Sequence, residues 1–415
     1  MCKEGVSMKK NHMVLGQGNY YSLDCFETGL NNNVMVVGAS GAGKTRGVVI
    51  PNLLMTSGSY VVSDPKGNLY KKYKEVFENK GYVVKKLDFT NPKDSAHYNF
   101  FRYIHSPQDM VKVAHMLIYQ RRSGGHMDPF WDEASQLLVQ SIIAYLKEEW
   151  NEEDQNLERL MQMIELCKAQ GDLDSSVTPL DRIMEKYESK NPDSYAVSTY
   201  NKFRVAASKT LRSILISVNS RLGLFATPEM CEMMQTDDID ISSIGKRKTA
   251  LFVVVSDTDR SMDGIANIFF TQAMNELCRV ADTECADNRL PVPVRFIMDD
   301  FATNCKIEEF PRMISSIRSR GISTMLMIQA ESQLFEGFGY DGKTIIGNCD
   351  TYVYLGGNDV ETAKAVAERL DVPLTKVLNM PVGTEWIFRR GQSPVNSQVF
   401  KLEGFEEKIM RGEER

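Results

Sequence analysis

The chain has 415 residues, more than one ordinary hydrophobic core accommodates, so its length favours two or three domains. Apolar residues make up 42% and charged residues 25%, which is the balance of a soluble globular protein, and a net charge of −6 does not indicate a polyanion-binding protein. The eight cysteines show no C-x-x-C spacing, which argues against a zinc site and against a disulfide framework.

Charge is unevenly distributed along the chain. The net charge is +8 over residues 1–125, −10 over 126–240 and −4 over the remainder, which indicates a separate acidic module in the middle. No apolar run approaches the roughly 18 residues that a membrane-spanning helix needs. The first ten residues also lack the apolar segment of a signal peptide. We therefore expect a cytoplasmic protein.

The first block alternates between strand and helix patterns. Strands are expected at 33–37, 60–63 and 82–87, and helices at 44–55 and 68–79. Short apolar runs that alternate with helical stretches are typical of βαβ units around a parallel sheet.

Strand patterns are absent from about residue 126 to residue 225. Helices are expected there at 130–150, 157–169, 180–189 and 194–222. In the first of these, Leu138, Ile142 and Tyr145 belong to an amphipathic stripe that is best explained by packing. We therefore expect an all-α domain, 126–225, inserted into an α/β domain.

Strands resume in the second half of the chain. They are expected at 250–255, 294–298, 324–328 and 352–355, with helices at 263–281, 310–320 and 360–370. The alternation matches that of the first block. The fold class is therefore predicted to be α/β with a mostly parallel sheet, built from 1–125 and 226–400. A loosely held tail is expected at 401–415.

A phosphate-binding loop follows the first strand. It satisfies G-x-x-x-x-G-K-[ST] and consists of Gly38, Ala39, Ser40, Gly41, Ala42, Gly43, Lys44 and Thr45. Glycines let the backbone curl so that successive N–H groups point at phosphate oxygens. Lys44 is expected to reach the β- and γ-phosphates, and the Thr45 hydroxyl to ligate Mg²⁺.

A P-loop also needs a carboxylate for the metal at the end of another strand. The apolar run 294–298 ends in Asp299 and Asp300. We expect Asp299 to hold Mg²⁺ and Asp300 to polarise the attacking water. An acidic turn at a strand end is the alternative explanation.

Three further features have weaker support. Ser63-Asp-Pro-Lys-Gly67 closes the second strand, where Pro and Gly form a turn whatever the function. Gln329 ends the strand after the one that carries Asp299, a position from which it could sense the γ-phosphate. The predicted helix 310–320 carries Arg318, which could stabilise transition-state charge on a neighbouring subunit, or could simply be solvated.

Several of these segments occur together in one known family. The P-loop segment Val36–Thr45, Ser63-Asp-Pro-Lys-Gly67 and Ile297-Met-Asp-Asp-Phe-Ala302 resemble the type IV secretion coupling proteins, the TraG/TraD-like conjugative DNA-transfer ATPases. Further matches are Asp128-Pro-Phe-Trp131, Ile328-Gln-Ala-Glu-Ser-Gln333 and Ile346-Gly-Asn-Cys-Asp-Thr-Tyr-Val-Tyr-Leu-Gly-Gly357. Together they run in the expected order from about residue 33 to residue 370.

The resemblance implies a RecA-like nucleotide-binding domain interrupted by an all-α domain. It also implies a hexameric ring with ATP and Mg²⁺ bound between subunits. Such proteins recruit relaxase-bound single-stranded DNA and pass it to a type IV secretion channel. The resemblance assigns Lys44 and Thr45 to the P-loop, and Asp299 to the metal. It places Arg318 at the trans-acting arginine and Gln329 at the sensor glutamine.

Two departures from the family pattern matter. Asp300 falls where the family usually has a catalytic glutamate, so water activation is expected to be slower or to need a small backbone shift. Family members also usually begin with transmembrane helices, and only about thirty residues precede the first strand here. We expect either a truncated chain or a short subtype that reaches the cytoplasmic face of the membrane through partners, and a monomer in dilute solution.

Three alternatives to a conjugative coupling ATPase stay open. One is another RecA-like DNA motor, FtsK-like or a helicase, which would lack the inserted helical domain. A second is a nucleotide-binding docking scaffold for the relaxase, in which Asp300 is too short to support turnover. The third is secretion of protein substrates by the same architecture.

Overall fold

A computed structural model describes residues 11–119, 129–168, 177–207, 210–304, 307 and 309–412. The chain divides into two compact units. The first contains Met1–Lys86, Asp240–Asp257 and Ala273–Arg415, and the second contains Leu87–Ile239 and Thr258–Gln272. The second unit includes more residues than the predicted all-α domain 126–225, and the boundaries of that domain stay a prediction.

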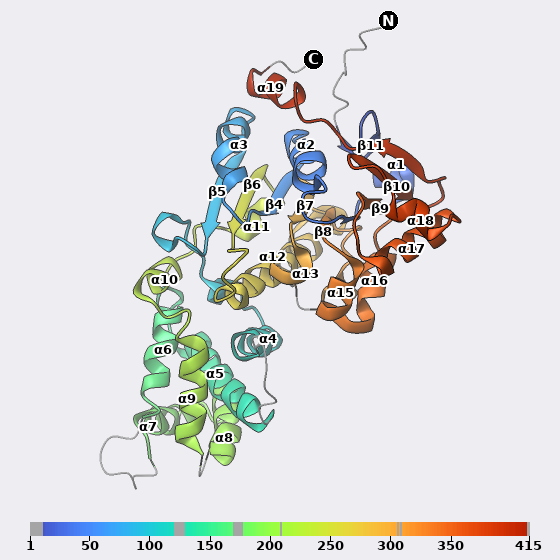
Figure 1. Ribbon diagram of the computed structural model, residues 1–415. Helices are drawn as coiled ribbons and strands as arrows, with labels where there is room; N and C mark the ends of the chain where they lie inside the picture. The colour runs from blue at the N-terminus through green and yellow to red at the C-terminus, as the bar shows by residue number, and fades with distance from the viewer. Residues whose placement is uncertain are drawn as a thin grey trace, which may run out of the picture. The chain divides into compact units, whose positions relative to one another are not determined.

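A single large sheet organises the first unit. The described part of the chain contributes nine strands to it: β3 (Val34–Val37), β4 (Ser59–Ser63), β5 (Val83–Asp88), β6 (Thr249–Val254), β7 (Val294–Met298), β8 (Ile322–Ile328), β9 (Thr351–Tyr354), β10 (Thr384–Arg389) and β11 (Val395–Gln398). Their order is β11-β10-β9-β3-β8-β7-β4-β6-β5, and Figure 1 shows the sheet running from the red strands β10 and β11 to the blue strand β5.

Most of this sheet is parallel. The strands from β9 to β6 pair in parallel, and β10 pairs antiparallel with both β9 and β11. β3, β4, β6 and β7 are buried along their whole length, because helices cover both faces of a parallel sheet and its strands are continuous apolar runs. The predicted α/β class with a mostly parallel sheet is confirmed.

Helices and a small hairpin complete the first unit. The longer helices are α3 (Asn68–Asn79), α12 (Asp263–Glu284, whose first half belongs to the second unit), α15 (Glu331–Phe338) and α17 (Val360–Leu370). The shorter elements are β1 (His12–Val14), β2 (Tyr20–Ser22), α1 (Cys25–Thr28), η1 (Lys44–Val49), α2 (Ile50–Leu54), α11 (Ile241–Ile244), η5 (Ala286–Asn288), α13 (Phe301–Asn304), α14 (Phe310–Met313), η6 (Gly339–Asp341), α16 (Gly342–Gly347), α18 (Leu374–Leu378) and α19 (Phe405–Met410). Tyr73 and Phe77 of α3 are fully buried against the sheet residues Tyr60 and Phe252.

The second unit is mainly helical. It contains η2 (Pro92–Asp94), η3 (Phe100–Tyr103), α4 (Pro107–Ile118), α5 (Pro129–Glu149), η4 (Glu152–Asp154), α6 (Leu157–Glu165), α7 (Pro179–Glu188), α8 (Tyr195–Ala207), α9 (Leu211–Leu222) and α10 (Pro228–Met233). α5 packs against α4, α6, α8 and α9, so it forms the centre of this unit. The predicted helix 194–222 is two helices, α8 and α9. None of the described helices, in either unit, is long and apolar enough to cross a bilayer.

The predicted helix 310–320 is shorter than expected. α14 ends at Met313, and residues 314–321 form turns. Ser315, Ser316 and Ser319 each donate a side-chain hydrogen bond to the carbonyl three residues earlier, at 2.8, 3.0 and 3.1 Å. Serine hydroxyls that bond to nearby backbone favour turns over a continued helix. Ile314 and Ile317 have the spacing of a helix, so the sequence pattern predicted a longer helix and did not reveal the effect of the serines.

The chain after residue 400 is held more firmly than predicted. Phe400, Leu402 and Ile409 are only 6%, 4% and 4% exposed, and Ile409 belongs to α19. Glu406 accepts hydrogen bonds from Tyr73 and from the Lys72 ammonium, both at 2.5 Å. The expectation of a loose tail at 401–415 is therefore wrong for the described residues up to 412. Its apolar residues are too widely spaced to produce a periodic pattern.

Candidate nucleotide-binding site

Four neighbouring strands place the predicted site residues at one edge of the sheet. β3, β8, β7 and β4 are adjacent and parallel, so their carboxyl ends lie together. The P-loop follows β3, Gln329 follows β8, Asp299 follows β7, and Ser63 ends β4. Ligands of parallel α/β sheets bind at this edge.

The P-loop backbone is held by its neighbours. The Gly38 N–H donates to the carbonyl of Ile328 at 3.2 Å, and the Ala39 N–H donates to that of Gly356 at 3.0 Å. A Cβ atom on Gly38 would lie 3.0 Å from the Leu355 Cβ, a tight contact that a side chain could adopt only if Leu355 shifted. Gly43 has φ 98°, a left-handed conformation that also favours glycine. The loop is therefore fixed in a curled form.

The helix after the loop begins with π-type geometry. η1 covers Lys44–Val49, and the N–H of Ile50 donates to the carbonyl of Thr45, five residues earlier. Such π-turns are frequent at functional sites. The predicted helix 44–55 is therefore present, as η1 followed by α2.

Lys44 lies folded back into the loop. Its ammonium donates to the carbonyl of Gly38 at 2.5 Å and to that of Ala39 at 3.2 Å. Burial lowers the pKa of Lys44, and the nearby carboxylates of Asp299 and Asp300 oppose that change. The side chain is thus a half-buried cation next to two carboxyl groups.

Asp299 and Thr45 are brought together from positions 254 residues apart in the sequence. The Thr45 hydroxyl donates to Asp299 Oδ2 at 3.3 Å, and the N–H of Asp300 donates to Oδ1 at 3.1 Å. Burial, and next the Asp300 charge, raise the pKa of Asp299. A hydroxyl beside a carboxylate is the pair of hard oxygen ligands that Mg²⁺ takes at a P-loop. These residues therefore fit a magnesium ion.

Asp300 and Gln329 lie at the open side of the same edge. The Gln329 amide donates to Asp300 Oδ1 at a long 3.4 Å, and the Gln329 N–H donates to the Gln333 side chain at 2.9 Å. Asp300 has φ 50°, an uncommon left-handed conformation that aspartate tolerates better than most residues. The structure thus brings together Lys44, Thr45, Asp299, Asp300 and Gln329.

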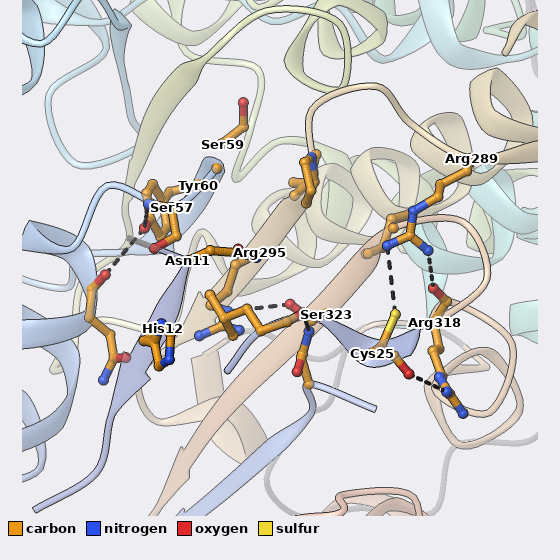
Figure 2. A pocket seen from close by; sticks show the side chains of 18 residues that line it. Asn11, His12, Cys25, Ser57, Ser59, Tyr60, Arg289, Arg295, Arg318 and Ser323 are labelled. Atoms are coloured by element: carbon orange, nitrogen blue, oxygen red, sulfur yellow. Dashed lines mark hydrogen bonds between the residues drawn. The ribbon is translucent and has the colours of Figure 1, made fainter. Parts of the chain in front are cut away.

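Arg318 lies at the opposite edge of the sheet from these five residues. It precedes β8, whose first residue Ile322 pairs with the first residue of β7, Val294. The seven residues of β8 span about 20 Å. Arg318 donates to the carbonyl of Cys25 at 2.9 Å (Figure 2). Arg318 is therefore too far away to contact a nucleotide bound at the P-loop of its own subunit.

The sequence matches one protein family over most of its length. The family described as type IV secretory system conjugative DNA transfer matches residues 1–371. The chain belongs to this family. VirD4 of Rhizobium rhizogenes is 25% identical over 369 residues, which are 85% of this chain and 51% of that protein. VirD4 of Agrobacterium fabrum is 24% identical over 350 residues, with 81% and 49% covered. The chain thus spans about half the length of these relatives.

Solved structures confirm the coupling-protein fold. The conjugative coupling protein TrwBΔN70, in its trigonal form with sulphate, has a TM-score of 0.69 at 16% identity, with 95% of this chain and 90% of that chain covered. TrwB with the ATP analogue ADPNP gives 0.68 at 16% identity, covering 94% and 89%. TrwB with ADP and Mg²⁺ gives 0.67 at 16%, covering 95% and 91%. The predicted RecA-like architecture of a type IV coupling protein is confirmed.

Two family segments have structural roles that the sequence alone did not reveal. Asp64, in the Asp-Pro-Lys-Gly turn, is 2% exposed and accepts a hydrogen bond from the N–H of Tyr70 at 2.9 Å, which fixes the start of α3. The carbonyl of Gly356, after β9, supports the P-loop. Asp64 and Gly356 each follow a buried strand of the sheet. That position is the feature of the sequence from which their roles could have been predicted. In the Asp-Pro-Phe-Trp motif, Asp128 lies outside the described residues.

Proposed function

We propose that this chain is a P-loop ATPase that couples ATP hydrolysis to the recruitment and transfer of relaxase-bound single-stranded DNA to a type IV secretion channel. The observation that carries the proposal is the contact between Thr45 Oγ1 and Asp299 Oδ2, with Lys44 in the adjoining loop. Membership of the conjugative DNA-transfer family supports the cargo. TrwB, solved with an ATP analogue and with ADP and Mg²⁺, supports ATP and Mg²⁺ as ligands.

In this proposal the P-loop binds the phosphates. Its N–H groups face the phosphate oxygens, and Lys44 exchanges its bonds to the Gly38 and Ala39 carbonyls for bonds to the β- and γ-phosphates. Thr45 and Asp299 would hold Mg²⁺, which when bound neutralises charge on the phosphates. Gly38 and Gly43 keep the loop curled, so little reorganisation is needed.

Asp300 and Gln329 orient the attacking water. Asp300 accepts the proton that the water loses as its oxygen bonds to the γ-phosphorus and the bond to ADP breaks. Gln329 is hydrogen-bonded to Asp300 and directly follows β8, the strand between β3 and β7. It can therefore report the state of the γ-phosphate.

The first test of the proposed function is ATP turnover by the purified chain, with and without single-stranded DNA. We expect DNA to stimulate Mg²⁺-dependent hydrolysis, because subunits that assemble on DNA complete one another's sites. Double-stranded DNA of equal length is the control for charge alone. Hydrolysis that DNA leaves unchanged would contradict a DNA-transfer motor.

Substitutions at Asp300 separate a motor from a docking scaffold. If Asp300 is the base, Asp300→Asn lowers kcat by roughly 10²–10⁴-fold and leaves ATP binding nearly unchanged. The carboxamide keeps the size of the side chain but cannot accept the proton. A parent protein that binds ATP without turnover, and gains it in Asp300→Glu, would instead favour the scaffold. Single-turnover assays and ATP titrations measure both quantities.

Mixing two inactive variants tests whether Arg318 acts in trans. We propose that the active form is a hexamer. The two variants to be mixed are Arg318→Ala and Lys44→Ala. Arg318→Ala alone is expected to lose at least roughly 10³-fold in turnover, the lower range for a trans-acting arginine, and Lys44→Ala alone roughly 10²–10³-fold. A mixture contains interfaces with an intact Lys44 on one side and an intact Arg318 on the other, so it should recover a measurable fraction of the activity.

The control for this mixing experiment is Arg312→Ala, because Arg312 is another exposed arginine in the same segment. It should retain turnover close to that of the parent. No recovery in the mixture, with both variants folded and assembled, would exclude Arg318 from the neighbouring site.

We further propose that the chain works at the cytoplasmic face of the membrane, through partner proteins of the secretion channel.

A further inference from the structure

A small cavity lies at the amino edge of the parallel strands, opposite the P-loop edge (Figure 2). The amino ends of β4, β7 and β8 line it, together with Asn11, His12, Leu23, Cys25 and Asn32. Its volume is about 60 Å³. Since one water needs about 10–15 Å³ on this measure, the cavity holds a group of roughly four to six heavy atoms. A whole nucleotide does not fit.

The cavity is strongly basic. Arg289, Arg295 and Arg318 line it, and none of the described lining residues is an aspartate or a glutamate. The other polar lining residues are amides, hydroxyls and one imidazole: Asn11, His12, Asn32, Asn52, Ser57, Ser59, Tyr60 and Ser323. Asn52, Ser59 and Tyr60 already donate to backbone carbonyls, and none of these side chains carries a negative charge that could balance the arginines.

Arg295 is the central feature of this cavity. It is the second residue of β7 and is 8% exposed. Its Nε donates to the Ser323 hydroxyl at 3.3 Å, and within the described part of the chain no carboxylate forms an ion pair with it. Burial lowers the pKa of its guanidinium. Buried arginines are normally paired, because an isolated charge is costly to desolvate.

The guanidinium of Arg295 has donors to spare. An arginine carries five N–H donors, and Ser323 takes one of them. In Figure 2 the Arg295 side chain extends between Ser323 and the segment containing Asn11 and His12. The remaining donors therefore lie among neutral polar side chains.

The other two arginines are held in place by backbone groups. Arg289 donates to the carbonyls of Arg318 and Ser319, at 3.4 and 3.3 Å, and to the Cys25 sulfur at 3.7 Å. Arg318 donates to the carbonyl of Cys25. These contacts fix the positions of the two side chains. Because the acceptors carry no formal charge, they do not neutralise the positive charge of the arginines. The cavity is therefore pre-organised.

We propose that this cavity binds a single phosphate-type oxyanion, with the Arg295 guanidinium as the main donor and the Ser323 hydroxyl beside it. The planar fork of an arginine matches two oxygens of a phosphate. The volume suits a five-atom tetrahedral ion. A doubly charged phosphate also balances several arginines better than a singly charged carboxylate does.

The test is a titration of the full chain with inorganic phosphate, in which the melting temperature of the protein is measured at each phosphate concentration. Lys44→Ala serves as the background, because phosphate can also reach the P-loop. In that background we expect saturable stabilisation by phosphate, and we expect Arg295→Met to abolish the saturable part. Arg312→Ala is the matched control and should leave it intact. Equal saturable stabilisation with and without Arg295 would overturn the proposal.

A second measurement locates the ion directly. Crystals of the parent protein soaked in selenate should show an anomalous peak beside Arg295 as well as any at the P-loop. A peak at the P-loop alone would overturn the proposal. If Arg295→Met fails to fold, Arg295→Lys and Ser323→Ala replace it, and each is expected to weaken phosphate binding at least tenfold. Retention of full affinity in both would count against the site.

Two sources of the phosphate can then be distinguished. A site for a free ion binds phosphate and excludes AMP, whereas a site for the terminal phosphate of a larger molecule binds both. Either result supports an oxyanion site. Neither result depends on ATP turnover, which is already strongly reduced in the Lys44→Ala background, so failure of the proposed function would be seen separately.

Discussion

Lys44→Ala is expected to lower ATP turnover by roughly 10²–10³-fold, the loss found when one pre-organised donor to a developing negative charge is removed. The reason is local. Lys44 is the cation within the loop. Burial lowers its pKa, and the two nearby carboxylates oppose that change. Alanine leaves the curled backbone, fixed by Ile328 and Gly356, unchanged. The P-loop N–H groups should therefore still bind phosphate, more weakly.

Nucleotide binding should fall less than turnover in this variant. A charge-assisted hydrogen bond contributes about 1.5–3 kcal/mol, which is about 10–100-fold in Kd. Titration with a fluorescent ATP analogue measures the affinity, and phosphate release measures the rate. Lys74→Ala is the matched control, because Lys74 is an exposed lysine on α3. Unchanged turnover in Lys44→Ala would remove the P-loop from the mechanism.

Glu385→Gln is expected to stabilise the protein at alkaline pH and to change little at acidic pH. Glu385 lies in β10 and is 0% exposed, and neither carboxylate oxygen has a hydrogen-bond partner among the described residues. Burial raises its pKa from 4.5 to about 8. The folded state therefore holds a proton that the unfolded state releases above pH 4.5. Stability is full below that pH and falls as the pH rises to about 8.

The expected size of the effect follows from the same values. Each pKa unit corresponds to about 1.4 kcal/mol, so the gain from Glu385→Gln at pH 9 is at most roughly 5 kcal/mol. Urea unfolding of the parent and the variant at pH 5 and pH 9 measures the difference. Glu403→Gln, at an exposed glutamate paired with Arg46, should change stability by less than about 1 kcal/mol at either pH. An identical gain at both pH values would show that Glu385 is ionised in the folded protein.

The sequence predicted the parallel strands and the site at their carboxyl edge. β3 is a continuous apolar run and β7 is apolar except for Arg295, and in such buried strands the residue that follows the strand lies at the ligand-binding edge. That reasoning placed Lys44, Asp299 and Gln329 together, as the structure has them. It could also place Asp300, since Asp300 is adjacent to Asp299 in the chain.

Other features had no local signal. β10 carries Glu385 and Arg389 among its buried residues, and charged residues inside a strand hide it from a search for apolar runs. Arg295 did not hide β7, but the cavity around it is formed by strands that are distant in the sequence. Arg318 was placed on a helix, whereas serine side chains end that helix early. Each miss reflects tertiary contacts or side-chain competition that a linear pattern does not contain.

Both end segments of the first unit are fastened to the helix that follows the P-loop. Asn52 of α2 bonds to the backbone of Val14, and the N–H of Gln17 donates to the carbonyl of Gln398 at 2.8 Å. A Cβ atom on Gly47 would lie 2.3 Å from Val399, so the returning strand touches η1 directly. A displacement of the segment after β11 would therefore act on η1, through the contact between Val399 and Gly47, and on the start of β10, through the bond from the Val399 N–H to the Gly383 carbonyl.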